Sequence, residues 1–239
     1  CFPEETLFFA LKSGRNDGHR YILELYHRGV RNFVVTEVPA NYASDYPQAN
    51  FLKVVDSLES LQRLAERHRD EFNIPIVGIT GSNGKTMVKE WLNQLLSDDL
   101  FVTRSPRSYN SQVGVPLSVW LLNEHSQVGV FEAGISQPGE MLALRDIIQP
   151  TIAVLTNLGD AHQENFVSRE AKCKEKLVLF HDAKIVVYNG DDSLISDCVN
   201  ALEDFRGERL YWSCSDHNAP FFVKSIEKKA TATTITYIY

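Results

Sequence analysis

Short apolar runs and longer amphipathic segments alternate through most of the chain. Runs rich in Val and Ile predict buried strands, whereas apolar residues at intervals of three and four predict helices. From residue 74 onwards, strands are expected at 74–79, 100–103, 127–132, 151–156, 184–188 and 210–212, and helices at 85–95, 113–123, 139–149, 168–180 and 192–200. Strands separated by helices are typical of a mostly parallel sheet that is covered on both faces.

Other patterns flank this alternation. Before it, strands are expected at 7–11, 32–37 and 51–55, a turn at 14–18, and helices at 19–28 and 57–72. After it, residues 220–226 and 231–239 alternate like the two arms of a β-hairpin. We therefore predict an α/β protein with a small N-terminal α/β domain at residues 1–72. A larger, mostly parallel-sheet domain follows at residues 73–239 and carries the β-hairpin tail.

One loop between a predicted strand and a predicted helix has the composition of a phosphate-binding site. The apolar run 74–79 stops at small residues, and Lys85 opens a helix in which Met87, Val88, Trp91, Leu92 and Leu95 fall near one face. Backbone N–H groups and a helix N-terminus attract phosphate, while a Lys side chain can reach the terminal phosphates and a Thr hydroxyl can bind magnesium. The candidate nucleotide-binding residues are Thr80, Gly81, Ser82, Asn83, Gly84, Lys85 and Thr86.

This loop is not a strict Walker A sequence, because Ile79 stands where that pattern has its first glycine. An ordinary glycine turn is the alternative.

Three other polar clusters lie at the carboxyl ends of predicted strands, the edge where α/β sheets bind ligands: Glu132, residues 157–162 and the loop after Val102. Glu132 ends an apolar strand, so a metal or another cation is expected beside it; a helix cap or a salt bridge is the alternative. His162 follows the strand 151–156 and suits a metal ligand, a base or a cap.

Composition narrows the class of protein. The 239 residues have 44% hydrophobic side chains, enough for a core, and a net charge of −7 that argues against a general nucleic-acid surface. Four scattered cysteines show no metal or disulfide spacing and favour a reducing cytoplasm. No apolar run is long enough for a membrane span and no signal peptide is evident. A start at Cys1 and an end within a strand pattern lead us to expect trimming at both ends.

Residues 78–86, Gly-Ile-Thr-Gly-Ser-Asn-Gly-Lys-Thr, resemble the ATP loop of the Mur ligases, which form amide bonds in peptidoglycan synthesis, and of the related folylpolyglutamate synthases. Three further stretches resemble the MurF-type ligases, which add D-alanyl-D-alanine: Thr-Asn-Leu-Gly-Asp-Ala-His at 156–162, residues 108–116, and first-domain segments at 7–12, 16–19 and 29–35. The resemblance covers nearly the whole chain.

The resemblance implies a role for each candidate residue. Residues 73–239 would form a P-loop ATPase domain that uses ATP and Mg²⁺, and residues 1–72 a domain that holds the UDP-sugar end of the substrate. Lys85, His162 and Lys176 would be catalytic, and Asn157 would lie near the nucleotide. The metal ligands would be Thr86, Glu132, His162 and Lys176, and the substrate-binding residues Asn110, Ser111, Gln112, Asp17 and His19. For Asp17 and His19, a solvated turn and helix cap is an equal alternative.

The implied lysine ligand is a carbamate, formed when a neutral lysine amine takes up carbon dioxide. Lys172, Lys174 and Lys176 share one predicted helix, and most lysines on such a helix lie on its solvated face. In the family an aromatic residue often follows the modified lysine by four positions, as Phe180 follows Lys176. This register favours Lys176, with Lys174 as the second choice.

The implied reaction joins D-alanyl-D-alanine to UDP-N-acetylmuramoyl-tripeptide through an acyl phosphate, and in some bacteria such a ligase is fused to alanine racemase. Because the family's C-terminal domain is not present, these residues alone are expected not to complete a catalytic cycle. Two alternatives stay open: another ligase of the superfamily, such as a folylpolyglutamate synthase, and a non-catalytic nucleotide-binding module.

Overall fold

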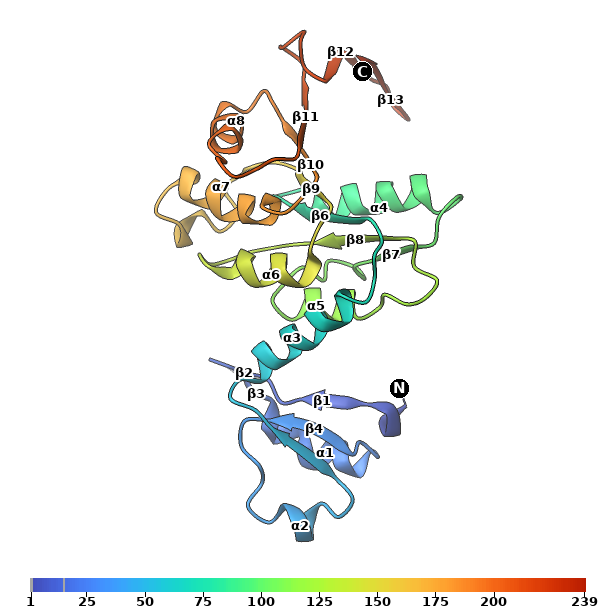
Figure 1. Cartoon of the computed structure of the whole chain (residues 1–239), viewed down its shortest axis with the longest axis vertical. Coiled ribbons are helices and arrows are strands. Elements are labelled where there is room, and N and C mark those ends of the chain that lie inside the picture. Colours follow the sequence, from blue (N-terminus) through green and yellow to red (C-terminus); the bar gives the residue numbers. More distant parts are fainter. Residues whose placement is uncertain (1, 15) are drawn as a thin grey trace. The chain divides into compact units, whose positions relative to one another are not determined.

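A computed structural model describes residues 2–14 and 16–239 (Figure 1). The chain divides into two compact units, one ending at Leu64 and the other beginning at Ala65. The division falls inside helix α3 (Ser57–Arg69), whereas the sequence pattern placed the domain boundary just beyond this helix.

The first unit is built on a parallel sheet in the order β1-β4-β5, whose strands span Leu7–Phe9, Asn32–Val35 and Asn50–Lys53. All three strands were predicted. The expected helix at 19–28 begins as a 3₁₀ turn, η2 (Gly18–Tyr21), before α1 (Ile22–His27). The smaller elements are η1 (Pro3–Glu5), β2 (Lys12–Ser13), β3 (Asn16–Asp17) and α2 (Tyr42–Asp45). Helix α2 was not predicted, and residue 15 of the expected turn lies outside the described residues.

The second unit holds an eight-stranded sheet in the order β13-β12-β11-β10-β9-β6-β8-β7 (Figure 1). All neighbouring strands are parallel except β12 and β13, which form the predicted hairpin. The strands are β6 (Ile76–Thr80), β7 (Val102–Arg104), β8 (Val128–Glu132), β9 (Ile152–Leu155), β10 (Ile185–Asn189), β11 (Glu208–Ser213), β12 (Phe221–Lys228) and β13 (Thr233–Ile238). The helices are α4 (Lys85–Leu96), α5 (Gly114–Val119), α6 (Glu140–Ile148), η3 (Gln163–Asn165), α7 (Arg169–Leu177), η4 (Val178–Phe180) and α8 (Ser193–Asn200). The prediction of a mostly parallel α/β sheet is confirmed.

The two faces of this sheet pack against different helices. On one face Val88 and Leu92 of α4 cover Val77, Ile79 and Val130. The opposite face carries the larger core, to which α5, α6, α7 and α8 all contribute. The predicted apolar stripe of α4 is only partly buried, because Met87, Trp91 and Leu95 are each more than half exposed. Helix α5 is shorter than the predicted 113–123.

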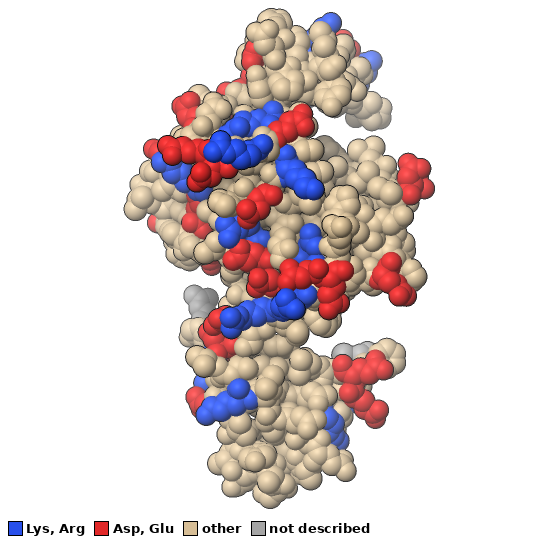
Figure 2. Space-filling view, in the orientation of Figure 1, with Lys and Arg blue, Asp and Glu red and all other residues tan. Residues whose placement is uncertain are grey.

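The surface charges, the cysteines and the lengths of the helices each bear on the class of protein. On the face drawn in Figure 2, basic and acidic side chains are intermixed. Cys173 and Cys198 are buried free thiols and Cys214 is an exposed one, while Cys1 lies outside the described residues. Within residues 2–14 and 16–239, no helix has both the length and the apolar character to span a bilayer.

Candidate active site

The phosphate-type loop lies between β6 and α4, as predicted. Gly81 and Gly84 have φ angles of +141° and +81°, conformations that side chains rarely tolerate. A Cβ atom at Gly81 would lie 1.9 Å from the Thr156 hydroxyl oxygen. The tight turn therefore requires glycine at 81. It leads directly into the N-terminus of α4, where the first N–H groups have no partner within the helix.

The segment that follows β9 braces this loop. The Asn157 carbonyl accepts a hydrogen bond from the Ser82 N–H, and the Asn157 side-chain oxygen accepts one from the Asn83 N–H, each at 3.0 Å. The Ser82 hydroxyl donates to the Gly159 carbonyl at 3.1 Å. The geometry thus gives Asn157 a role in shaping the loop, in addition to the predicted position near a nucleotide.

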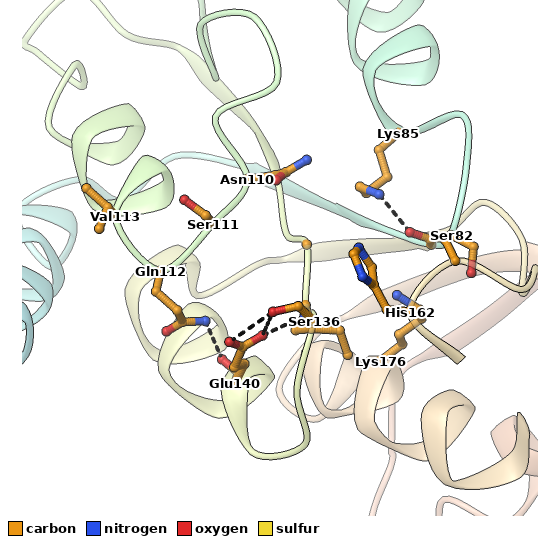
Figure 3. A pocket seen from close by; sticks show the side chains of 14 residues that line it. Ser82, Lys85, Asn110, Ser111, Gln112, Val113, Ser136, Glu140, His162 and Lys176 are labelled. Carbon is orange, nitrogen blue, oxygen red and sulfur yellow. Dashed lines mark hydrogen bonds between the residues drawn. The ribbon is translucent and has the colours of Figure 1, made fainter. Parts of the chain in front are cut away.

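The loop lysine points into a cavity. The Lys85 ammonium donates to the Gly81 carbonyl at 2.8 Å (Figure 3). Burial lowers the pKa of Lys85 from its ordinary value, and the Glu132 charge opposes this shift. The hydrogen bond lies within one turn of chain, so an incoming anion could replace it without disturbing the rest of the fold.

Glu132 ends β8 with its carboxylate fully buried. Its Oε2 accepts from the Thr86 hydroxyl at 3.0 Å and from the Asn110 amide at 3.5 Å. Its Oε1 lies 3.1 Å from the Lys89 ammonium but has no hydrogen-bond donor, so the contact is an ion pair at an angle unsuited to a hydrogen bond. A cation beside Glu132 was expected, and the salt-bridge alternative is present as Lys89.

Four separate loops converge on a cavity of about 290 Å³ at the carboxyl edge of the sheet (Figure 3). Eight of the residues predicted from the sequence line it: Gly81, Ser82, Lys85, Asn110, Ser111, Gln112, His162 and Lys176. Thr86 and Glu132 do not line the cavity, but both contact the 108–110 segment: Thr86 contacts the Ser108 hydroxyl at 3.2 Å, and Glu132 accepts from the Asn110 amide. Thr80 is buried at the strand end, and Asn83 and Gly84 are exposed on the loop.

The three lysines of α7 have different surroundings. Lys174 is exposed and forms an ion pair with Glu170 at 2.6 Å, which raises its pKa. Lys172 is buried and donates to the Gly159 carbonyl at 2.6 Å. Lys176 is buried and lines the cavity, and within the described residues its ammonium has no hydrogen-bond or ion-pair partner. Burial, helped by the Lys85 and Lys172 charges, lowers the pKa of Lys176 to about 8. The geometry favours Lys176 over the other two as the reactive amine.

Sequence reasoning missed two polar residues. Ser136 lines the cavity, and its N–H donates to the Glu140 carboxylate at 2.6 Å, while the Glu140 carbonyl accepts from Gln112 at 3.0 Å. Lys89 was not among the residues predicted for the site. A signal existed for it, because a residue four positions after Lys85 lies on the same face of the helix.

Asp17 and His19 lie in the first unit and form a closed network. The His19 Nδ1 lies 2.6 Å from the Asp17 carboxylate, and Nε2 accepts from the Thr36 N–H at 3.1 Å. An acceptor at Nε2 places the proton of the neutral ring on Nδ1, which donates to Asp17. Lys12 lies 3.7 Å from Asp17 and 2.9 Å from Glu37. This geometry favours a structural role, and direct contact of either residue with a substrate stays a prediction.

The sequence of the second unit also matches a known family. A family model described as the Mur ligase middle domain covers residues 79–239. The chain belongs to the Mur ligase family. This membership confirms the resemblance found in the loop at 78–86.

Two relatives within the Mur ligase family carry one name, UDP-N-acetylmuramoyl-tripeptide–D-alanyl-D-alanine ligase. The Bacillus subtilis protein is 29% identical over 94% of this chain and 50% of its own length, and the Treponema pallidum protein is 34% identical over 73% of this chain and 39% of its own. This chain spans about half the length of the relatives it matches, or less.

Solved structures agree on the fold. MurF from Thermotoga maritima, in complex with ADP, has a TM-score of 0.82 and 28% identity, covering 98% of this chain and 54% of that one. MurF from Acinetobacter baumannii has a TM-score of 0.85 at 23% identity, covering 95% and 49%. The predicted α/β fold with a mostly parallel sheet is thereby confirmed.

The residues present suit magnesium. Magnesium takes oxygen ligands and is usually bound through one or two protein groups, with waters and substrate phosphates completing the shell. Thr86 and Glu132 supply such oxygens 3.0 Å apart, through the Thr86 hydroxyl and Oε2 of Glu132. Within residues 2–14 and 16–239 no three His, Cys, Asp or Glu side chains gather in a way that could hold a metal ion.

Proposed function

We propose that this chain is the nucleotide- and substrate-binding part of an ATP-dependent ligase that joins D-alanyl-D-alanine to UDP-N-acetylmuramoyl-tripeptide. The observation that carries the proposal is the convergence of the phosphate-type loop, residues 110–112, His162 and Lys176 on one cavity. The names of the similar Bacillus and Treponema proteins support the choice of substrates. We assign ATP to the unit that holds this cavity and the UDP-sugar to the first one. Scattered free thiols support a cytoplasmic location.

The proposed reaction has two steps. A carboxylate oxygen of the tripeptide attacks the γ-phosphorus of ATP, the bond to ADP breaks, and an acyl phosphate forms. The amine of D-alanyl-D-alanine then attacks the acyl carbon, loses a proton, and expels inorganic phosphate as the amide forms. Such chemistry depends mostly on alignment and charge stabilisation. Lys85 would leave the Gly81 carbonyl to contact the transferred phosphoryl group, and Asn110, Ser111 and Gln112 would orient the acceptor.

Thr86 and Glu132 would hold magnesium, which when bound would neutralise negative charge on the phosphates. His162 lines the same cavity as Lys85 and Lys176 (Figure 3), and we assign it to a second magnesium. His162 lines this cavity, and Thr86 and Glu132 contact the 108–110 segment that leads to it.

Lys176 would act as a carbamate. The neutral amine attacks carbon dioxide, a C–N bond forms and one proton is released, so a cation becomes an anion that can bind metal. A pKa of about 8, caused first by burial, leaves part of the amine neutral near pH 7.5. With ¹³C-labelled carbon dioxide, NMR should show a carbamate signal that Lys176→Met removes. Lys174→Met is the matched control, and a signal lost only with Lys174 would reverse the assignment.

Calorimetric titration tests the proposed function. UDP-muramoyl-tripeptide would be added in magnesium and a non-hydrolysable ATP analogue, with UDP-muramoyl-dipeptide and a folate as comparators. Selective binding of the tripeptide is the expected result. Folate binding would move the chain to the folylpolyglutamate synthases, and nucleotide binding that survives Lys85→Ala without any acceptor binding would favour a non-catalytic module.

A further inference from the structure

Lys89 carries a buried charge that no step of the proposed reaction uses. Its side chain is fully buried on α4, one helical turn after Lys85. A buried ammonium is unfavourable unless charged and polar partners surround it. Lys89 has four such contacts: the Ser105 carbonyl at 2.9 Å, the Arg107 carbonyl, the Glu132 carboxylate at 3.1 Å and the Glu90 carboxylate at 3.2 Å.

These contacts join three parts of the candidate site. Helix α4 supplies Lys85 and Thr86, the loop after β7 leads to residues 110–112, and β8 ends at Glu132. Within that loop the Ser105 hydroxyl accepts from the Glu132 N–H at 3.1 Å. Lys89 and Ser105 therefore fix the backbone and one carboxylate oxygen of Glu132. The other oxygen, Oε2, is left directed at Thr86.

We propose that Lys89 is a positioning residue that holds Glu132 and the 105–107 turn in the arrangement that receives a magnesium–nucleotide complex. The inference rests on the proposed function, because it takes Thr86 and Glu132 as the oxygens facing magnesium. Because the ion pair with Lys89 holds Oε1, rotation of the Glu132 carboxylate is restricted and Oε2 stays beside the Thr86 hydroxyl.

Two simpler roles make different predictions. If Lys89 only stabilises the fold, its loss lowers stability without altering the effect of magnesium on nucleotide binding. If Lys89 mainly competes with magnesium for Glu132, its loss makes magnesium more effective. Glu90, which also contacts Arg104 at 3.3 Å, lies 3.2 Å from the Lys89 ammonium and offsets part of its charge. The offset weakens the competition role and leaves orientation as the main effect.

The test measures ADP affinity of this 239-residue chain by calorimetry, in magnesium and in EDTA. The unchanged protein should bind ADP more tightly in magnesium. Lys89→Met should reduce that gain about tenfold, as expected for a group that orients a metal ligand, and should leave the affinity in EDTA nearly unchanged. Lys184→Met is the matched control, since Lys184 is an exposed lysine of the same unit, and it should keep the full gain.

A double variant tests whether Lys89 acts through Glu132. Glu132→Gln should lose the same magnesium gain, and Lys89→Met with Glu132→Gln should lose no more than either change alone. Should Lys89→Met fail to fold, as judged by circular dichroism, Lys89→Gln keeps a donor for the two carbonyls and carries the same expectation. A full or increased magnesium gain in either folded variant overturns the proposal. Absence of ADP binding by the unchanged protein would instead refute the proposed function itself.

Discussion

Two regions of this molecule contain a histidine near acidic and basic groups, but their polar atoms are used differently. In the first unit both ring nitrogens of His19 already have partners, Asp17 on one side and the Thr36 N–H on the other. At the cavity, within the described residues, the Lys176 ammonium has no such partner and the His162 ring makes no hydrogen bond. Buried polar groups in native proteins are usually satisfied, so the buried Lys176 ammonium, which faces the cavity without a partner, is the better candidate for ligand binding, whereas the His162 ring is exposed.

A polar motif therefore does not by itself indicate a binding site. Asp17 and His19 are as conspicuous in the sequence as residues 156–162. Only the geometry separates a network that stabilises a turn from side chains that are free to meet a ligand.

Gly81→Ala should have the largest effect. The new Cβ would lie 1.9 Å from the Thr156 hydroxyl at a φ of +141°, so we expect the free energy of unfolding to fall by about 3 kcal/mol. Gly84→Ala is the matched control: it also has a positive φ, +81°, but no atom within 4 Å of the new Cβ, and it should cost about 1 kcal/mol. Urea denaturation measures both values. Equal losses would mean that backbone conformation alone, and not the contact with Thr156, determines glycine at 81.

Lys85→Ala should come next, through binding and not through stability. The lysine makes one local hydrogen bond, to the Gly81 carbonyl, so its removal should scarcely change the unfolding midpoint. Loss of a charged contact to phosphate should weaken ADP binding in magnesium by roughly 10- to 100-fold. Calorimetry provides the affinity and thermal denaturation the control. Unchanged affinity would place the nucleotide elsewhere.

The sheet and the edge that carries the candidate site could be predicted from sequence, because strands and helices follow from local patterns of apolar residues. The alternation of Val-rich runs with helices determines a parallel sheet, and a parallel sheet brings the ends of β6, β8 and β9 to one edge. The loop at 81–84, Glu132 and His162 could therefore be expected to lie near one another before any coordinates were known.

The rest depends on partners distant in the sequence. Helical periodicity groups Met87, Trp91 and Leu95 with Val88 and Leu92, yet the sheet covers only the last two. Lys89 looks like a solvated lysine, and only the carbonyls of Ser105 and Arg107, folded back over α4, bury it. No pattern local to residues 85–96 contains that information.

His19→Ala tests the other side of the comparison. Removing the ring leaves the Thr36 N–H without its ring acceptor and takes one of several partners from the Asp17 carboxylate, so we expect a loss of about 1 to 2 kcal/mol in the free energy of unfolding. ADP affinity should not change. His27→Ala, at an exposed position of α1, should affect neither quantity. If His19→Ala kept full stability but lost binding of the UDP-sugar substrate, the closed network would be a binding site after all.

Asp191→Asn should have the smallest effect. Asp191 lies at the edge of the sheet that carries the cavity, and its hydrogen bonds form a closed network there. It follows β10, and hydrogen bonds from the Ser213 and Ser215 hydroxyls, with a further one from the Cys214 N–H, lower its pKa to about 2. A carboxyl whose pKa is lower in the folded state than the ordinary 3.8 stabilises the fold above pH 4, and that contribution disappears as pH falls from about 4 to 2.

Because Asp191 is exposed, solvent screening should keep this contribution below about 1 kcal/mol. Asp191→Asn should therefore flatten the acid limb of the stability curve slightly between pH 4 and 2, with ADP affinity unaffected. Asp182→Asn, at an exposed carboxylate of the same unit, is the control for general charge. A drop in nucleotide affinity with Asp191→Asn alone would show that a residue with satisfied hydrogen bonds at this edge can still contribute to binding. The absence of partners at His162 and Lys176 would then no longer distinguish binding residues from structural ones.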